Sequence, residues 1–96
     1  MINHVVLLQP KTETTAEQIA IALRHVASLK EAIPEIVSVT TGRNMSANHQ
    51  GYTYGFVMRF ADGESFSAYA PHPAHQPVSQ ELQAICESII DFDLDG

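Results

Sequence analysis

The chain has few of the residues that mark several common classes of protein. Its 96 residues include one cysteine, no tryptophan, and five lysines or arginines against eleven aspartates or glutamates. The single Cys86 cannot form a disulfide within the chain, and no basic, apolar leader opens the sequence, so a cytoplasmic protein is expected. No apolar run approaches the roughly 18 residues of a membrane-spanning helix, so we expect no membrane segment. A chain of this length suits a single domain, residues 1–96.

The basic residues are confined to the first part of the chain. The last is Arg59, and seven acidic residues follow it without a base. Nucleic acids and anionic membranes are bound by clustered lysines and arginines, so a net charge of -6 argues against both partners. The final acids, Asp91, Asp93 and Asp95, alternate with apolar residues, which is typical of a strand with one solvated face.

Apolar periodicity predicts an alternation of strands and helices. The clearest helix opens with Thr15 and Gln18 at capping-box spacing, continues with apolar residues at helical spacing, and stops before Pro34. Runs of β-branched and alternating apolar residues predict the strands. The expected elements are strands over residues 2–8, 36–41, 52–60 and about 90–94, and helices over residues 15–32, 65–69 and 74–87.

This order is β-α-β-β-α-β, if the two short helical pieces count as one crossover. It predicts an α+β, ferredoxin-like βαββαβ sandwich, with helices on one face of a four-stranded sheet. The other sheet face would be uncovered, and an apolar face of this kind is normally covered by a partner. We therefore expect a homodimer with the two sheets face to face. The residues expected to line that face are Val5, Leu7, Val37, Val39 and Val57.

Histidine and tyrosine supply the candidates for proton-transfer chemistry. Imidazole exchanges protons near neutral pH because its ordinary pKa is about 6.5. His75 falls in the first turn of a helix, where the helix dipole favours the neutral ring that a base requires. Tyr69 could donate a hydrogen bond to a carbonyl oxygen that becomes anionic. The alternative is structural: His75 as a helix cap, Tyr69 as a packed aromatic and His4 as a hydrogen-bonded core residue.

Other chemistry finds little support in the sequence. His72 and His75 have a spacing at which two histidines can share a metal ion, but Pro73 constrains the backbone between them and no CxxC or HExxH motif accompanies them. The sequence has no glycine-rich phosphate loop and no G-x-S-x-G motif. We therefore expect neither a metal nor a cofactor. Cys86 is expected to be a small core residue in the middle of the last helix, and His25 is expected on the solvated surface.

Taken together, the motifs resemble the stress-responsive dimeric α/β-barrel (Dabb) family, from His4 to about Phe92. The resemblance implies a ferredoxin-like monomer whose sheet pairs with a second copy to form a closed barrel. The family includes plant stress proteins and a plant polyketide cyclase that forms olivetolic acid. The segments that carry the resemblance are HVVLL, IPEIVSVTTGRN, GYTYGFVMRF, YAPHPAHQPV and IIDFDLD.

Similarity to the cyclase implies roles for individual residues. The catalytic tyrosine and histidine of the cyclase match Tyr69 and His75, and its first-strand histidine matches His4. The cyclase has a histidine after G-Y-T where this chain has Tyr54. That difference changes the proton chemistry of one pocket group, so the resemblance alone does not establish the cyclase's substrate or its reaction for this chain.

Two functions follow from the sequence. In the first, the protein is a cofactor-free acid-base enzyme, cyclase-like or isomerase-like, that acts on a small carbonyl compound. His75 would be the base, Tyr69 would stabilise the enolate oxygen, and His4 would orient the substrate or His75. In the alternative, the protein has no catalytic activity and binds a hydrophobic small molecule or serves in a stress response. The residues expected to contact the ligand are Tyr54, His72, Phe56 and Met58.

Overall fold

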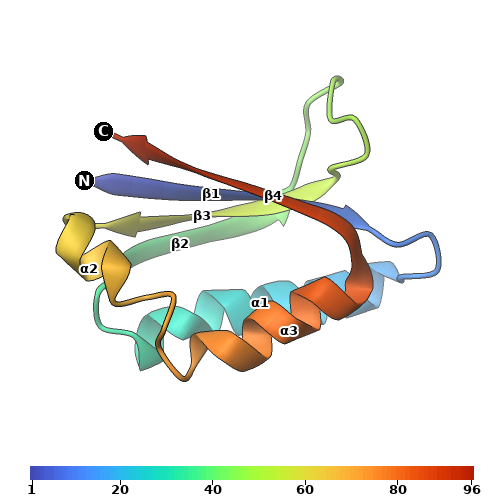
Figure 1. The fold of residues 1–96 in the computed structure, drawn as a ribbon. Coiled ribbons are helices and arrows are strands. Elements are labelled where there is room, and N and C mark those ends of the chain that lie inside the picture. The colour runs from blue at the N-terminus through green and yellow to red at the C-terminus, as the bar shows by residue number, and fades with distance from the viewer.

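A four-stranded antiparallel sheet with helices on one face forms the fold (Figure 1). The computed structural model describes all residues, 1–96. The strand order β2-β3-β1-β4 confirms the predicted ferredoxin-like α+β arrangement. No helix combines the length and apolarity needed to cross a membrane. The elements are β1 (Ile2–Pro10), α1 (Ala16–Ala32), β2 (Ile36–Arg43), β3 (Tyr54–Phe60), α2 (Gly63–Ser67), α3 (His75–Ile85) and β4 (Cys86–Asp95).

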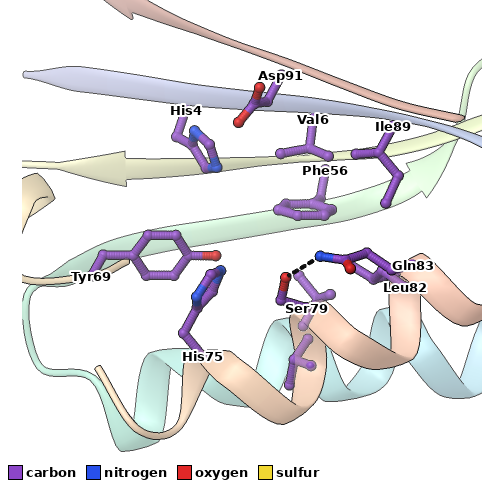
Figure 2. Close-up of a pocket in the computed structure, with 12 residues that line it drawn as sticks. His4, Val6, Phe56, Tyr69, His75, Ser79, Leu82, Gln83, Ile89 and Asp91 are labelled. Carbon is purple, nitrogen blue, oxygen red and sulfur yellow. Dashed lines mark hydrogen bonds between the residues drawn. The ribbon is translucent and has the colours of Figure 1, made fainter. Parts of the chain in front are cut away.

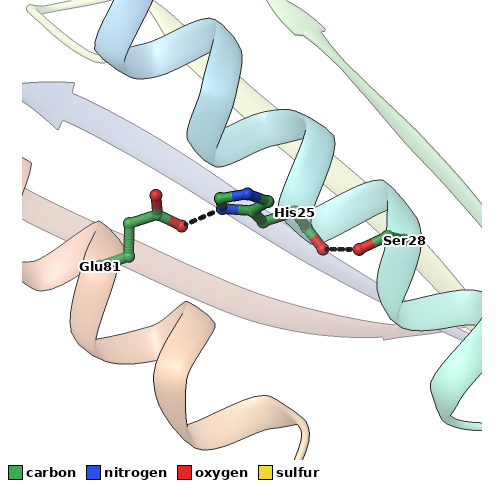
Figure 3. A network of polar contacts seen from close by, with 3 residues as sticks. All are labelled: His25, Ser28 and Glu81. Atoms are coloured by element: carbon green, nitrogen blue, oxygen red, sulfur yellow. Dashed lines mark hydrogen bonds and ion pairs between the residues drawn. The ribbon is translucent and has the colours of Figure 1, made fainter.

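The two long helices lie side by side across the sheet (Figure 1). The predicted capping box opens α1: the Thr15 hydroxyl accepts from the Gln18 backbone N–H, and the Gln18 side chain accepts from the Thr15 N–H. On the outer surface, His25 Nδ1 lies 2.8 Å from Glu81 Oε1, and the Ser28 hydroxyl donates to the His25 carbonyl (Figure 3). This exposed pair links α1 to α3 and is screened by solvent.

The core lies between the sheet and the two long helices. It contains apolar side chains from every strand and from both long helices, with Leu8, Met58 and Phe60 fully buried. Burial of this apolar surface is the main source of the fold's stability. His4 is the one buried polar or charged residue, at 7% exposure. A single polar side chain in an otherwise apolar core needs a hydrogen-bond partner.

Several element boundaries differ by a few residues from the sequence prediction, and two of these differences have a clear physical cause. The short helix α2 begins at Gly63, earlier than expected, because the Asp62 carboxylate accepts the Ser65 backbone N–H and caps it. The last helix stops at Ile85, and Cys86 already has an extended backbone. Cys86 is buried, as expected, but it begins β4 and pairs with Pro10, so its placement in the middle of a helix was wrong.

The uncovered sheet face also differs from the prediction at one residue. A bulge between Ile36 and Ser38 shifts the alternation of β2. Val39 therefore pairs with Met58 and packs against the core, so its assignment to the uncovered face was wrong. Beyond Val5 and Leu7 of β1, which were predicted to lie on this face, β4 adds apolar residues that were not. The uncovered apolar face consists of Val5, Leu7, Val37, Val57, Ile90, Phe92 and Leu94.

The same register places the acidic residues of β4 on the helix-facing side of the sheet. His4 pairs with Asp93 and Val6 with Asp91. Directly opposite residues of an antiparallel pair point to the same face, and His4 and Val6 point toward the helices because both are buried in the core. The carboxylates are exposed because β4 is an edge strand, so they are solvated as predicted, although they lie on the side of the sheet that the helices cover.

Gly55 provides a test of how closely β3 and β1 approach each other. A Cβ atom at Gly55 would lie 2.6 Å from the Val6 carbonyl oxygen, whereas a Cβ at Gly42, the cross-strand partner of Gly55, would meet nothing within 4 Å. We expect Gly55→Ala to lower the free energy of unfolding by about 1–3 kcal/mol through overpacking. Urea denaturation checks this, with Gly42→Ala as the matched control. Equal stabilities of the two variants would contradict the close approach.

Candidate active site

A cavity of about 270 Å³ opens between α3 and the helix-facing side of the sheet (Figure 2). An apolar cavity of about 150 Å³ can hold benzene, so this one has room for a single ring with a short substituent. Its walls come from all strands except β2, from the turn before α3, and from both long helices. They consist of His4, Val6, Val26, Phe56, Tyr69, His75, Val78, Ser79, Leu82, Gln83, Ile89 and Asp91.

Tyr69 points its hydroxyl into the cavity from the segment that connects α2 to α3 (Figure 2). The residue is only 4% exposed, and its ring packs against His75 and His4, with centroid separations of 4.5 and 5.7 Å. Burial raises the pKa of Tyr69 to about 12, and the nearby charge of Asp91 acts in the same direction. At neutral pH the group is therefore a protonated phenol that can donate a hydrogen bond.

His75 begins α3, and a backbone contact fixes its tautomer. Its Nδ1 lies 3.1 Å from the Ala70 carbonyl oxygen. A carbonyl can only accept, so Nδ1 carries the hydrogen and the neutral ring has its lone pair on Nε2. Burial lowers the pKa of His75 and nearby His4 lowers it further, while the hydrogen bond to Ala70 acts in the opposite direction. The neutral ring was predicted from the helix dipole, and burial is a further cause that acts in the same direction.

His4 is held by a carboxylate from the neighbouring strand. Its Nδ1 donates to Asp93 Oδ1 at 2.6 Å. This bond satisfies the buried ring and leaves Nε2 available at the cavity wall. Sequence reasoning missed Asp93 as a partner. The two-residue period of the acids in β4 was the available signal, but it could not be used without the β1–β4 register.

Of the four residues predicted to contact a ligand, only Phe56 lines the cavity. Met58 is fully buried in the core. Tyr54 lies at the far end of β3, paired with Leu8. His72 accepts the Ala74 backbone N–H on Nδ1 at 3.1 Å, so it organises the turn before α3. No three histidine, cysteine, aspartate or glutamate side chains lie close enough to share a metal ion.

Three polar residues of the cavity were not identified from the sequence. Ser79 and Gln83 lie one and two turns after His75 on the same face of α3, and Gln83 Nε2 donates to the Ser79 hydroxyl at 3.1 Å (Figure 2). Their spacing of four residues from His75 was a usable signal. Asp91 lines the cavity from β4, next to His4 (Figure 2). The acidic alternation was interpreted as a solvated face, which concealed this role.

The chain is similar to known proteins over nearly its whole length. A curated stress-response A/B barrel domain-containing protein of Arabidopsis thaliana is 26% identical over 94 residues, which cover 95% of this chain and 82% of that protein. A dimeric ferredoxin-like protein of unknown function from Jannaschia sp. CCS1 is 30% identical, with a TM-score of 0.87 over 99% of this chain and 98% of that one.

An enzyme is also among the similar structures. The hydroxynitrile lyase of Passiflora edulis shares the fold, with a TM-score of 0.89 and 18% identity over 97% of this chain and 90% of that one. The family model for the stress responsive A/B barrel domain matches residues 2–95. The chain therefore belongs to the stress-responsive A/B barrel domain (Dabb) family.

Proposed function

We propose that this protein is a cofactor-free acid-base enzyme that acts on a small carbonyl compound, as a cyclase or an isomerase does. One observation carries the proposal: a proton donor and a proton acceptor, Tyr69 and His75, line the same small cavity. Their protonation states are complementary, since the phenol stays protonated and the imidazole stays neutral. The buried Tyr69 and the half-buried His75 are partly shielded from water, which strengthens such polar contacts.

The reaction begins with removal of a proton from the carbon next to the carbonyl. His75 Nε2 takes the proton, and the electron pair of the C–H bond moves into a carbon–carbon double bond. The carbonyl oxygen gains negative charge and accepts a hydrogen bond from the Tyr69 hydroxyl. In isomerisation, an enolate that is conjugated with a further double bond takes the proton back from the His75 imidazolium at another carbon. In cyclisation, the enolate carbon attacks a second carbonyl within the molecule, whose π bond breaks, and the resulting alkoxide takes that proton.

His4 acts as a positioning residue in this scheme. Asp93 holds Nδ1, so the ring has one orientation, and its Nε2 can contact the substrate. The ring also packs against Tyr69 at a centroid separation of 5.7 Å, so it helps to fix the direction of the phenol. A base and a donor contribute to catalysis only when both are held in the productive geometry.

A second candidate function is non-catalytic binding of a hydrophobic small molecule. The observation that favours it is the apolar wall formed by Val6, Val26, Phe56, Val78 and Leu82. Such a cavity needs no proton transfer to retain a ligand. The stress-response description of the Arabidopsis relative is compatible with this function.

The proposed functional unit is a homodimer formed by the uncovered apolar face of the sheet. The large side chains Ile90, Phe92 and Leu94 are 43%, 42% and 54% exposed there. Contiguous apolar surface of this kind marks an interaction site. The Jannaschia relative, which is described as dimeric, supports this assembly. The cavity lies on the opposite side of the sheet, so each protomer keeps its own site.

The proton-abstraction step can be measured before the natural substrate is known. We expect the protein to exchange the protons next to the carbonyl of one-ring aldehydes and ketones, such as phenylacetaldehyde, for deuterium in D₂O, as followed by proton NMR. The rate should fall as pH drops through the pKa of His75, below the ordinary value of about 6.5, because the protonated ring cannot accept a proton. The high pKa of Tyr69 means that no loss should follow at moderately alkaline pH.

An exchange rate equal to that of buffer across a panel of such compounds would contradict the enzymatic proposal. Saturable binding of the same compounds without exchange would then favour the non-catalytic alternative. Exchange that increases toward acidic pH would instead exclude neutral His75 as the base.

A further inference from the structure

The carboxylate of Asp91 is not explained by the proton-transfer scheme. It lines the cavity from an edge strand and lies near His4 (Figure 2). None of the hydrogen bonds or ion pairs that hold His4, His25 and the helix caps includes it. Asp93, two residues later on the same strand face, is by contrast engaged by His4. Asp91 therefore presents a carboxylate that is free to contact a ligand.

The charged groups in and beside the cavity give it a net negative charge. No lysine or arginine lines it. The neutral forms of Tyr69 and His75 contribute no charge near neutral pH. The pair of His4 and Asp93 is neutral or negative, depending on whether the imidazole is protonated. Asp91 and the pair of His4 and Asp93 together carry one or two negative charges. These charges repel a carboxylate or phosphate on a ligand.

We propose that Asp91 is the specificity-determining residue of the cavity, and that it selects carbonyl compounds bearing an ammonium group over those bearing a carboxylate or phosphate. This inference rests on the proposed function for the carbonyl part of the substrate. The ammonium group donates charge-assisted hydrogen bonds to the Asp91 carboxylate. The cavity volume, about 270 Å³, limits the rest of the molecule to a single ring or a short chain.

The position of Asp91 also bears on the enolate. A carboxylate near the Tyr69 hydroxyl disfavours negative charge there, as its effect on the phenol shows. The same repulsion would act on an enolate oxygen bound to Tyr69. An ammonium group on the substrate neutralises Asp91 and removes that repulsion, so a cationic substrate is favoured in the reaction as well as in binding.

A binding experiment with three one-ring probes tests the selection directly. The probes are benzylamine, benzyl alcohol and benzoate, which are cationic, neutral and anionic at neutral pH. Titrations of the full-length protein at low salt, followed by protein NMR, should show binding in that order of affinity. We expect benzylamine to bind about tenfold more tightly than benzyl alcohol, the effect of one charge-assisted hydrogen bond.

Asp91→Asn keeps the shape of the side chain and removes its charge. In this variant the preference for benzylamine over benzyl alcohol should fall to near one, and benzoate should bind more tightly than to the wild type. Asp95→Asn is the matched control, because it removes the same charge from the same face of β4 without touching the cavity. Its probe preferences should equal those of the wild type.

Three results would overturn the inference: equal affinity of the wild type for benzylamine and benzoate, the same loss of preference in Asp95→Asn as in Asp91→Asn, or no binding of any probe. The outcome is separable from that of the deuterium exchange assay. Ammonium selection without proton exchange would leave the inference standing and refute the enzyme. Exchange of neutral and anionic carbonyl compounds as fast as ammonium-bearing ones would support the enzyme and refute the inference.

Discussion

His75→Ala is expected to lower the rate of deuterium exchange by about 10²- to 10⁴-fold, the usual contribution of a general base. The variant loses the Nε2 lone pair that His75 presents at the cavity, where the hydrogen bond between Nδ1 and the Ala70 carbonyl holds the ring. The half-buried ring also packs on Tyr69, so we expect a loss of about 1 kcal/mol in unfolding free energy. Exchange rate and melting temperature together separate the two effects.

Tyr69→Phe tests the other half of the site with less structural change. It removes the hydroxyl that points into the cavity and keeps the buried ring that packs against His4 and His75. Removal of one preorganised donor to an oxyanion typically costs about 10²- to 10³-fold in rate. His25→Ala is the control for both variants, because His25 lies outside the cavity on the exposed surface of α1 and should leave the rate unchanged.

Two results would contradict the assigned roles. Wild-type exchange rates in both His75→Ala and Tyr69→Phe would show that the cavity catalyses nothing through these groups. Unfolding of His75→Ala with a full rate in Tyr69→Phe would show that the histidine is structural, as the helix-cap interpretation of the sequence proposed.

The fold could be predicted from the sequence because its signals are local. The capping residues Thr15 and Gln18, the stop before Pro34 and the two-residue alternation of the strands each report on a few neighbouring residues. The errors arose where the backbone conformation of one or two residues changed which face the following side chains occupy or where an element ends. The bulge after Ile36 turned Val39 toward the core, and a single extended residue, Cys86, lengthened β4 at the expense of α3.

The site could be predicted only in part, because its polar partners come from distant segments. Tyr69 and His75 belong to one motif, and both line the cavity. Asp93 and Asp91 reach the site only through the β1–β4 register, a contact across some 89 residues of sequence for His4 and Asp93. Acidic residues that alternate with apolar ones are usually on a solvated strand face. The neighbouring sequence holds no signal that shows which face of the strand borders a cavity.

Phe92→Asp is expected to convert the proposed homodimer into a monomer at micromolar concentration. The side chain lies in the uncovered apolar face of the sheet, where it pairs with Val5 of β1. In the protomer it is 42% exposed, so a carboxylate there stays in contact with water and costs the fold little. In a sheet-to-sheet dimer the same carboxylate would be buried without a partner, at a cost of several kcal/mol. Sedimentation velocity and a thermal melt measure assembly and folding separately.

Met45→Asp is the matched control for the dimer test, because it makes the same apolar-to-acidic change at a loop residue that is 81% exposed. It should sediment as the wild type does. Val39→Asp, which the sequence alone would have suggested, is the wrong test, since Val39 packs against the core and its loss of stability would be mistaken for a loss of assembly. A Phe92→Asp protein that remains dimeric would place the interface elsewhere, because residue 92 belongs to the apolar surface that a face-to-face arrangement of the sheets would bury.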